Sequence, residues 1–227
     1  MRSFEDILSI AALRKGGVAA VMAGIPVPKS PDALAATADS DWLATMAKGI
    51  FQAGISWTVV DNKWPGILEA FHHFDIGEVT FQPPDWWQDL CDDPRIIRSP
   101  PKVQAILHNA ALIRRIRDEH GSFGRFVADW PGEDLAGLLQ WLGTEGQRLG
   151  GNTGPYVLRQ MGKDGYVLSQ DVVARLEAEG VIDKAPTSKK GWAAVQAAFN
   201  QWQGESGLPL TTISRVLAQS IGGDAHD

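Results

Sequence analysis

The sequence lacks several features that would indicate a protein class directly. It has one cysteine, Cys91, among 227 residues, which excludes an internal disulfide and a cysteine-rich zinc site. No run of about 18 apolar residues occurs, so no membrane span is expected. The first residues, MRSFEDIL, do not have the charged-then-apolar pattern of a signal peptide, and a cytoplasmic location is therefore expected.

Familiar cofactor and metal motifs are also missing. The five histidines are His72, His73, His108, His120 and His226, and none belongs to an HExxH pattern. Neighbouring residues such as His72 and His73 point in different directions on a helix, so they are a poor ligand pair. There is no CxxC, no GxxxxGK[ST], no GxGxxG and no GxSxG. We therefore expect neither a metal nor a cofactor.

What is present is the composition of a folded globular protein. Hydrophobic residues make up 44% of the chain, charged residues 21%, and nine are tryptophans, which excludes disorder as the main state. The net charge of −6 and a pI near 5.4 argue mildly against a nucleic-acid partner. The charge is unevenly distributed, however: residues 61–93 carry −7, residues 95–125 carry +5, and residues 184–215 carry +3. Such a chain can present a basic face to a polyanion, although chance patterning on solvated helix faces is the alternative.

The hydrophobic pattern is helical almost throughout. Phe4–Leu13 has an apolar stripe of period 3.6, and the longest predicted helix runs from Pro100 to about Glu119. Only Tyr166–Leu168 favours a strand, and it is too short to make a sheet. Glycines and prolines mark turns between the segments, with a loop over Ile25–Pro31 and a helix from Trp64 to Phe71. The sequence predicts an all-α fold of about ten short helices, as a single domain over residues 1–227.

Residues 51–57, FQAGISW, interrupt the helical pattern in a distinctive way. Gly54 ends one helix and Ser56 starts the next, which places Trp57 just after a tight turn. An indole there can face a cavity and stack on a planar ligand, while Gln52 bonds to the edge of that ligand. The alternative is a core tryptophan at a helix corner.

A second segment, LGGNTGPY at 149–156, places a glycine-rich turn between two predicted helices. This is a helix-hairpin-helix pattern: glycines let the backbone approach a phosphate, and the new helix offers free N–H groups and its positive end. Such contacts do not depend on base sequence. An ordinary turn between helices is the alternative.

Further along, Gln170 and Asp171 stand at the start of a predicted helix. A carboxylate at this place can stabilise an oxocarbenium ion or activate water. Asp171 can equally complement the helix dipole and do nothing else.

Taken together, these segments resemble the DNA-3-methyladenine glycosylase I family. The segment 51–57 is similar to the family's Q-A-G-L-S-W motif, and the likeness continues through EAFHHFD at 69–75, IIR at 96–98, and KVQAI with NA at 102–110. The resemblance covers residues 38–180 as a family-like core and leaves 1–37 as a divergent N-terminal helical extension. The wider superfamily is the all-α, two-lobed helix-hairpin-helix DNA glycosylases.

The resemblance implies base-excision repair of alkylation damage: the protein flips an alkylated purine such as 3-methyladenine out of DNA and hydrolyses its N-glycosidic bond. The implied partner is double-stranded DNA containing a damaged base, and the implied protein is a monomer without a cofactor. Phe51, Gln52 and Trp57 would form the base pocket, and Ile55 would be the wedge in the duplex. The residues implied in binding DNA are Arg98, Lys102, Gly151, Asn152, Thr153 and Gly154.

The chain also departs from the family pattern. The N-terminal Y-H-D-x-E-W-G segment is missing, and Gly49 stands where the family has an acid that reads the base. Asp171 stands in the place of a zinc-ligating histidine, and we take Asp171, with Gln170, as the catalytic candidate. No lysine occupies the position used by lyases, although Lys163 is not far away, so a monofunctional hydrolase is expected.

Two other functions fit the same residues. The loss of the acid at position 49 favours a non-catalytic helix-hairpin-helix DNA-binding protein. The net charge of −6 favours a protein-interaction scaffold.

Overall fold

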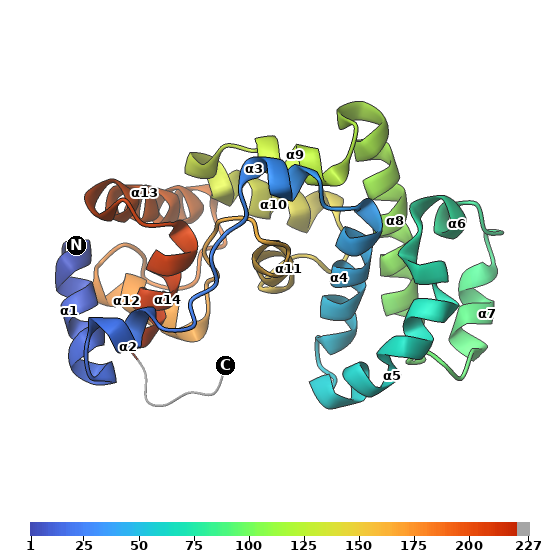
Figure 1. The fold of residues 1–227 in the computed structure, drawn as a ribbon, viewed down its shortest axis with the longest axis horizontal. Coiled ribbons are helices and arrows are strands. Elements are labelled where there is room, and N and C mark those ends of the chain that lie inside the picture. Colours follow the sequence, from blue (N-terminus) through green and yellow to red (C-terminus); the bar gives the residue numbers. More distant parts are fainter. Residues whose placement is uncertain (222–227) are drawn as a thin grey trace. The chain divides into compact units, whose positions relative to one another are not determined.

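The computed structural model describes residues 1–221, and its fold is drawn in Figure 1. These residues form fourteen α-helices and two short 3₁₀ helices, and none of them lies in a strand. The expected all-α fold is confirmed. The helices outnumber the ten or so predicted because some have only five residues, such as α3 (Pro31–Ala35), which begins at the last residue of the predicted loop.

The chain divides into two compact units. Among the described residues, the first unit comprises 1–28, 131–137 and 164–221, and the second comprises 29–130 and 138–163. The two units agree with the two-lobed architecture expected from the resemblance, whereas the boundary of a family-like core at residue 180 stays a prediction.

The second unit is built around one long helix, α8 (Pro100–His120). Against it pack α4 (Asp39–Gln52), α6 (Ile76–Thr80), α7 (Trp86–Asp92) and α9 (Phe123–Asp129). The unit is completed by α3, α5 (Trp57–Ala70), η1 (His72–Phe74), the larger part of α10 (Leu135–Glu145) and α11 (Thr153–Met161). Helix α8 has a continuous row of buried apolar residues, from Val103 to Ile116, which explains why its neighbours gather on it.

Helix α5 differs from its prediction. The sequence predicts two helices here, one that Ser56 starts and another over Trp64–Phe71. Instead one helix begins at Trp57, with Ser56 at its N-cap, and continues through Pro65, whose missing N–H removes one backbone bond. The preceding α4 ends at Gln52, so the interruption predicted around Gly54 is confirmed.

A close approach within the second unit depends on a glycine. Helix α3 packs on α9, and a Cβ added to Gly124 would lie 2.8 Å from the carbonyl oxygen of Leu34 and 3.0 Å from that of Thr37. Any larger residue at 124 would push the two helices apart.

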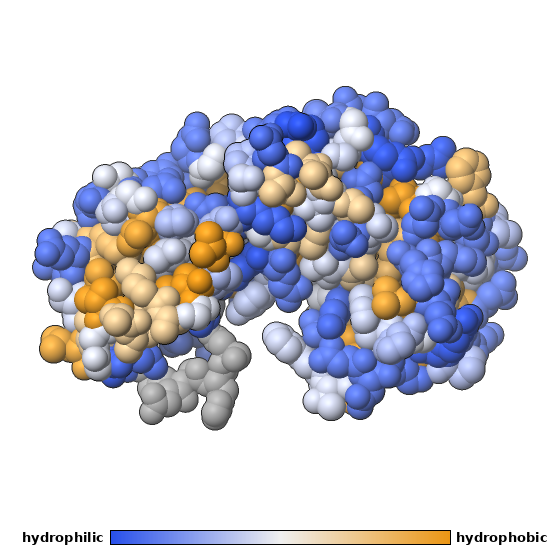
Figure 2. Space-filling view, viewed as in Figure 1, coloured by the Kyte–Doolittle hydropathy of each residue, from blue (hydrophilic) through white to orange (hydrophobic). Residues whose placement is uncertain are grey.

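The first unit gathers on α14 (Leu210–Ser220), against which α1 (Phe4–Lys15), α12 (Gln170–Ala178) and α13 (Lys189–Ser206) pack. The unit also contains α2 (Val18–Met22) and η2 (Gly132–Asp134). Its core includes Tyr166, stacked on Phe199 with ring centroids 4.2 Å apart. Figure 2 shows apolar side chains over α1 and α2 on the visible face. Leu13 of α1 and Val18 of α2 are exposed.

The strand-favouring run at Tyr166–Leu168 joins no sheet; Tyr166 and Val167 are buried and Leu168 is half-buried. The N–H groups of Gly165 and Val167 donate to the hydroxyls of Thr211 and Ser214, each at 3.2 Å. Helix α14 thus supplies side-chain partners where a neighbouring strand would supply backbone ones.

A buried ionic cluster ties the start of the chain into the first unit. Arg2 donates to Glu179 through its backbone N–H at 2.8 Å and its guanidinium at 2.7 Å. Arg175 reaches the same carboxylate at 3.1 Å and donates to Ser220. Burial raises the pKa of Glu179, but these hydrogen bonds outweigh it and hold that pKa below its ordinary value.

Candidate functional site

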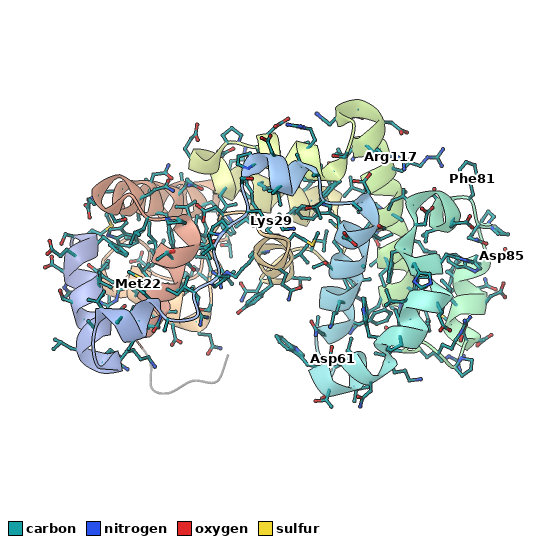
Figure 3. The ribbon with its side chains drawn as sticks, viewed as in Figure 1. Met22, Lys29, Asp61, Phe81, Asp85 and Arg117 are labelled. Carbon is teal, nitrogen blue, oxygen red and sulfur yellow. The ribbon has the colours of Figure 1, made fainter. Side chains whose placement is uncertain are left out.

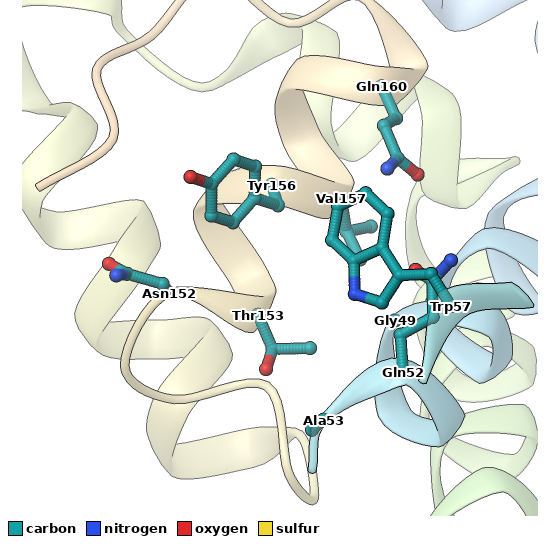
Figure 4. A pocket seen from close by; sticks show the side chains of 9 residues that line it. All are labelled: Gly49, Gln52, Ala53, Trp57, Asn152, Thr153, Tyr156, Val157 and Gln160. Carbon is teal, nitrogen blue, oxygen red and sulfur yellow. The ribbon is translucent and has the colours of Figure 1, made fainter. Parts of the chain in front are cut away.

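A cavity of about 150 Å³ opens in the second unit (Figure 4). One wall comes from the end of α4, the following turn and the start of α5, and the other from the hairpin and α11. The lining residues are Gly49, Gln52, Ala53, Trp57, Asn152, Thr153, Tyr156, Val157 and Gln160. An apolar cavity of similar size in another protein takes up benzene, so this one has about the volume of a single aromatic ring.

The first wall depends on a tight turn after α4. The N–H of Ile55 donates to the carbonyl of Gln52 at 3.3 Å, Ala53 has φ −63° and ψ 103°, and Gly54 has φ +78°. These are the angles of a type II turn, which requires positive φ at its third residue and hence favours glycine there. The turn brings Trp57 to the first position of α5.

Trp57 is unusual among the tryptophans of the chain. Its side chain is 61% exposed, whereas the eight other tryptophans are buried or half-buried. A large indole left in water forgoes a burial free energy of about 2 kcal/mol or more. In Figure 4 the indole lies at the cavity, with the carboxamides of Gln52 and Gln160 beside it. Such an arrangement can stack on a flat ring and bond to its edge.

The second wall is the predicted helix-hairpin-helix. Helix α10 ends at Glu145 and α11 begins at Thr153, with Asn152 rather than Thr153 at the N-cap. Gly151 has φ +60°, and a Cβ on Gly154 would collide with the carbonyl oxygen of Leu149. The turn therefore requires glycine at both places.

The hairpin amides are not all available to a phosphate. The N–H of Gly154 already donates to the carbonyl of Leu149 at 3.0 Å. The N–H groups of Gly151 and Thr153 donate to no other described residue, and Thr153 opens the nine-residue helix α11. An anion could be bound by these two amides and the positive end of α11.

Lys102 has a different place from the one the resemblance implies. Its side chain is buried, and its ammonium donates to the carbonyls of Phe51 at 2.9 Å and Ala53 at 2.7 Å. It thereby caps the last carbonyls of α4. Burial, and secondarily the charge of Arg148, lowers the pKa of Lys102.

Asn109 holds the opposite wall. It is completely buried, and its amide nitrogen donates to the carbonyl of Gln147 at 3.0 Å, while its amide oxygen accepts from the N–H of Gln147 at 2.8 Å. The side chain therefore pairs with one hairpin residue in both directions.

Gly49 lets the two walls approach each other. A Cβ at position 49 would lie 3.3 Å from Cγ2 of Thr153 and 3.6 Å from Cγ2 of Val157. These contacts are tight, so a larger side chain at 49 must displace α11 or turn into the cavity.

Other predicted residues are placed as follows. Phe51 is fully buried and does not line the cavity, because the period of α4 turns it to the core while Gln52 turns outward. Ile55 is half-buried in the turn. Arg98 is exposed at the surface, 3.6 Å from Asp92.

Gln170 and Asp171 belong to the first unit, so the structure leaves their catalytic assignment untested. Helix α12 begins at Gln170, one residue before the predicted start, and the hydroxyl of Ser169 caps it by accepting from the N–H of Val172 at 3.4 Å. Asp171 is half-buried in the first turn. Lys163, in the second unit, donates to the carbonyl of Trp130 at 2.8 Å.

Sequence reasoning missed three residues at this site. Tyr156 and Gln160 lie on the cavity side of α11, one turn apart, and Arg148 is an exposed cation in the hairpin with φ +58°. The spacing of 156 and 160 from Asn152 gave a signal, because residues four apart share a helix face.

Within 1–221 no group of three or more His, Cys, Asp or Glu residues could hold a metal ion, and His226 lies outside this range. No helix in this range is both long and apolar enough to cross a membrane.

Comparison with known families supports the resemblance. Residues 35–136 match the family model described as methyladenine glycosylase. This region fits the DNA-3-methyladenine glycosylase I family. The match includes the turn with Trp57 and the whole of α8, and it ends near the start of α10.

Individual relatives show how far the similarity extends. The chain is 34% identical over 76 residues to DNA-3-methyladenine glycosylase 1 of Escherichia coli, a match that spans 34% of this chain and 41% of that relative. A solved 3-methyladenine DNA glycosylase I from Staphylococcus aureus is 23% identical, with a TM-score of 0.49 over 56% of this chain and 77% of the other. Another 3-methyladenine DNA glycosylase I is 24% identical, with a TM-score of 0.47 over 60% of this chain and 81% of the other.

Proposed function

We propose that this protein is a DNA glycosylase of base-excision repair, which hydrolyses the N-glycosidic bond of an alkylated purine such as 3-methyladenine after base flipping. The observation that carries the proposal is Trp57, the most exposed tryptophan of the described residues, held at a ring-sized cavity inside the family-matched region. The proposal includes a monomer that acts in the cytoplasm without a cofactor.

The cavity supplies what a flipped base needs. Flipping a base out of the duplex costs a few kcal/mol, and least for a damaged base. Stacking on Trp57 therefore has to offset only a small unstacking free energy. Base–aromatic stacking contributes about 1–3 kcal/mol. The carboxamides of Gln52 and Gln160 offer a donor and an acceptor each to the edge of the base.

Contacts with the DNA backbone are assigned to the hairpin. The N–H groups of Gly151 and Thr153 would bind a phosphate with Asn152 beside them, and the exposed Arg98 would add charge. Ile55, at the tip of the turn before Trp57, would fill the gap that the flipped base leaves in the duplex.

Hydrolysis is assigned to Asp171, with Gln170 next to it. A carboxylate stabilises the positive charge that develops on the sugar as the bond to the base breaks, or orients the attacking water. Because an alkylated cationic purine is already a good leaving group, this assistance need not be large. A hydrolase of this kind forms no Schiff base with the sugar.

Release of free base from methylated duplex DNA tests the proposal. Trp57→Ala should lower kcat/KM by about 10- to 100-fold, the equivalent of the stacking energy. Phe81→Ala is the matched control: Phe81 is 79% exposed in the same unit, beside Arg114 and away from the cavity lining (Figure 3), and its loss should change little. Equal activity of wild type and Trp57→Ala would contradict the role of the indole.

The catalytic assignment has its own test. Asp171→Asn should reduce base release while leaving the affinity for duplex DNA within about twofold, because only the charge developed in the transition state loses its partner. Full activity of Asp171→Asn would remove Asp171 from the mechanism. Trapping of a covalent adduct with borohydride would contradict the monofunctional assignment.

A second function is favoured by Gly49. With no side chain on the floor of the cavity at that position, the protein could bind DNA and accept a flipped base without catalysing its release. Salt-dependent binding to an abasic-site duplex, together with no release of base from methylated DNA, would identify this non-catalytic DNA-binding protein.

A further inference from the structure

We infer that Lys102 and Asn109 are positioning residues, through which helix α8 holds the two walls of the Trp57 cavity in register. The inference rests on the proposed function only for its effect on base release, because the contacts themselves are structural. Neither side chain lines the cavity.

Lys102 controls the first wall. The two carbonyls it binds, those of Phe51 and Ala53, flank Gln52, and Ala53 is the second residue of the type II turn that leads to Trp57. The last carbonyls of α4 have no partner within the helix, so without the ammonium the buried carbonyl of Phe51 would be left unsatisfied, while that of Ala53 lies in a partly buried place. A single ammonium therefore fixes where α4 stops and where the turn begins.

Asn109 holds the second wall in the same way, through hydrogen bonds from its side chain to backbone groups. Its amide occupies both backbone groups of Gln147, which lies between the end of α10 and the glycines of the hairpin. Because both the N–H and the carbonyl of Gln147 are bound to Asn109, the hairpin has one preferred position against α8. The neighbouring His108 also reaches the hairpin side, 2.9 Å from the carbonyl of Glu145.

The two contacts are coupled by the helix that carries them. Seven residues are close to two turns of an α-helix, so positions 102 and 109 lie on one face, about 10 Å apart along the axis. Helix α8 is 21 residues long and runs through the unit with a buried apolar row. Helix α8 thus holds the end of α4 through Lys102 and the hairpin before α11 through Asn109, while α4 and α11 also pack directly on each other.

Hydrogen exchange at the amides, read by mass spectrometry, tests the positioning without any need for activity. In Lys102→Met, exchange at the hydrogen-bonded amides of Ala53 and Ile55, within residues 51–57, should rise about tenfold or more, while the amide of Gln147 keeps its protection. Asn109→Leu should give the reverse. A rise spread evenly over the second unit would show a purely general destabilisation and would overturn the inference.

Two matched controls separate position from chemistry. Lys63→Met removes another lysine that donates to a carbonyl, that of Pro94 at 2.6 Å, and Asn200→Leu removes another asparagine that donates to one, that of Glu133 at 3.0 Å. Neither should change exchange at 51–57 or 147–152. Lys102→Arg, which keeps a cationic donor, should restore part of the protection.

Base release from methylated DNA is the second readout. Lys102→Met and Asn109→Leu should each lower kcat/KM by about tenfold, and Lys63→Met should not. If the wild type releases no base, the proposed function fails, while the exchange pattern still decides the positioning roles. If the wild type is active and both variants retain full activity, the positioning inference is overturned and the proposed function stands.

Discussion

Each of the two units buries one charged side chain to the same extent, but the two buried charges have different partners and different structural roles. Lys102 in the second unit and Glu179 in the first are both 8% exposed. Lys102 faces neutral carbonyls, so burial dominates and lowers its pKa, which means that the fold disfavours its charge. Glu179 faces two guanidiniums, and the fold favours its charge.

The difference shows what each unit requires. In the second unit a buried ammonium orders the turn beside a cavity, and its desolvation is only partly offset. In the first unit a buried carboxylate joins Arg2, near the start of the chain, to α12 and, through Arg175, to the end of α14. The charge of Lys102 orders the backbone beside the cavity, and the charge of Glu179 links segments that are distant in the sequence.

The largest effect is expected from removing the buried carboxylate of Glu179 in the first unit. Glu179→Ala leaves the guanidinium of Arg175 buried without its carboxylate and should destabilise the first unit by about 3–5 kcal/mol. Denaturant unfolding measures the loss, and exchange in α1 and α12 locates it. A destabilisation below about 1 kcal/mol would show that Glu179 is not what holds the start of the chain.

Acidification should weaken the same cluster in a defined direction. Since the pKa of Glu179 is lowered in the folded state, its contribution is present above the unfolded pKa of a glutamate and is lost as pH falls through the folded pKa. Thermal melts of wild type and Glu179→Gln should therefore converge towards acid pH. A constant difference between the two melts would contradict this linkage.

A smaller effect sharpens the packing of the second unit. Gly124→Ala would bring a methyl to 2.8 Å from a carbonyl of α3 and should destabilise the protein by about 1–3 kcal/mol. Chemical denaturation gives the value. If the variant is as stable as wild type, α3 and α9 can separate freely.

The smallest effect has the opposite sign and lies in the first unit. A Cβ added to Gly204, inside α13, would meet nothing within 4 Å, and Gly→Ala there should stabilise the protein by about 0.4–1 kcal/mol. The melting temperature should rise by a few degrees. A lower melting temperature would mean that the open space beside α13 is not available.

Local rules predict much of the fold. Pro100 opens α8 and Ser56 stands just before α5, both as the sequence predicts. The rules mislead where tertiary packing outweighs them. The separate helix expected over Trp64–Phe71 is part of the longer α5, which contains Pro65, and the apolar run at Tyr166 finds its hydrogen-bond partners on α14 rather than on a strand.

The site was predictable in its motifs more than in its contacts. The Q-A-G-I-S-W turn and the glycine-rich hairpin are read from the chain because each needs a particular residue at a particular φ. The sequence assigns Lys102 to a phosphate, whereas in the structure its ammonium donates to the carbonyls of Phe51 and Ala53. The sequence of a basic stretch does not distinguish a lysine that faces solvent from one that binds backbone carbonyls.

Most of the helices, the two turns and the match of residues 35–136 to a methyladenine glycosylase model follow from local sequence, because capping, periodicity and glycine placement act over a few residues. Long-range packing is needed to bring nine residues from two distant segments to one cavity, to leave Trp57 exposed there, and to place Lys102 and Asn109 against the backbone of its walls. These features depend on contacts between residues about 40 to 110 positions apart, which no local pattern records.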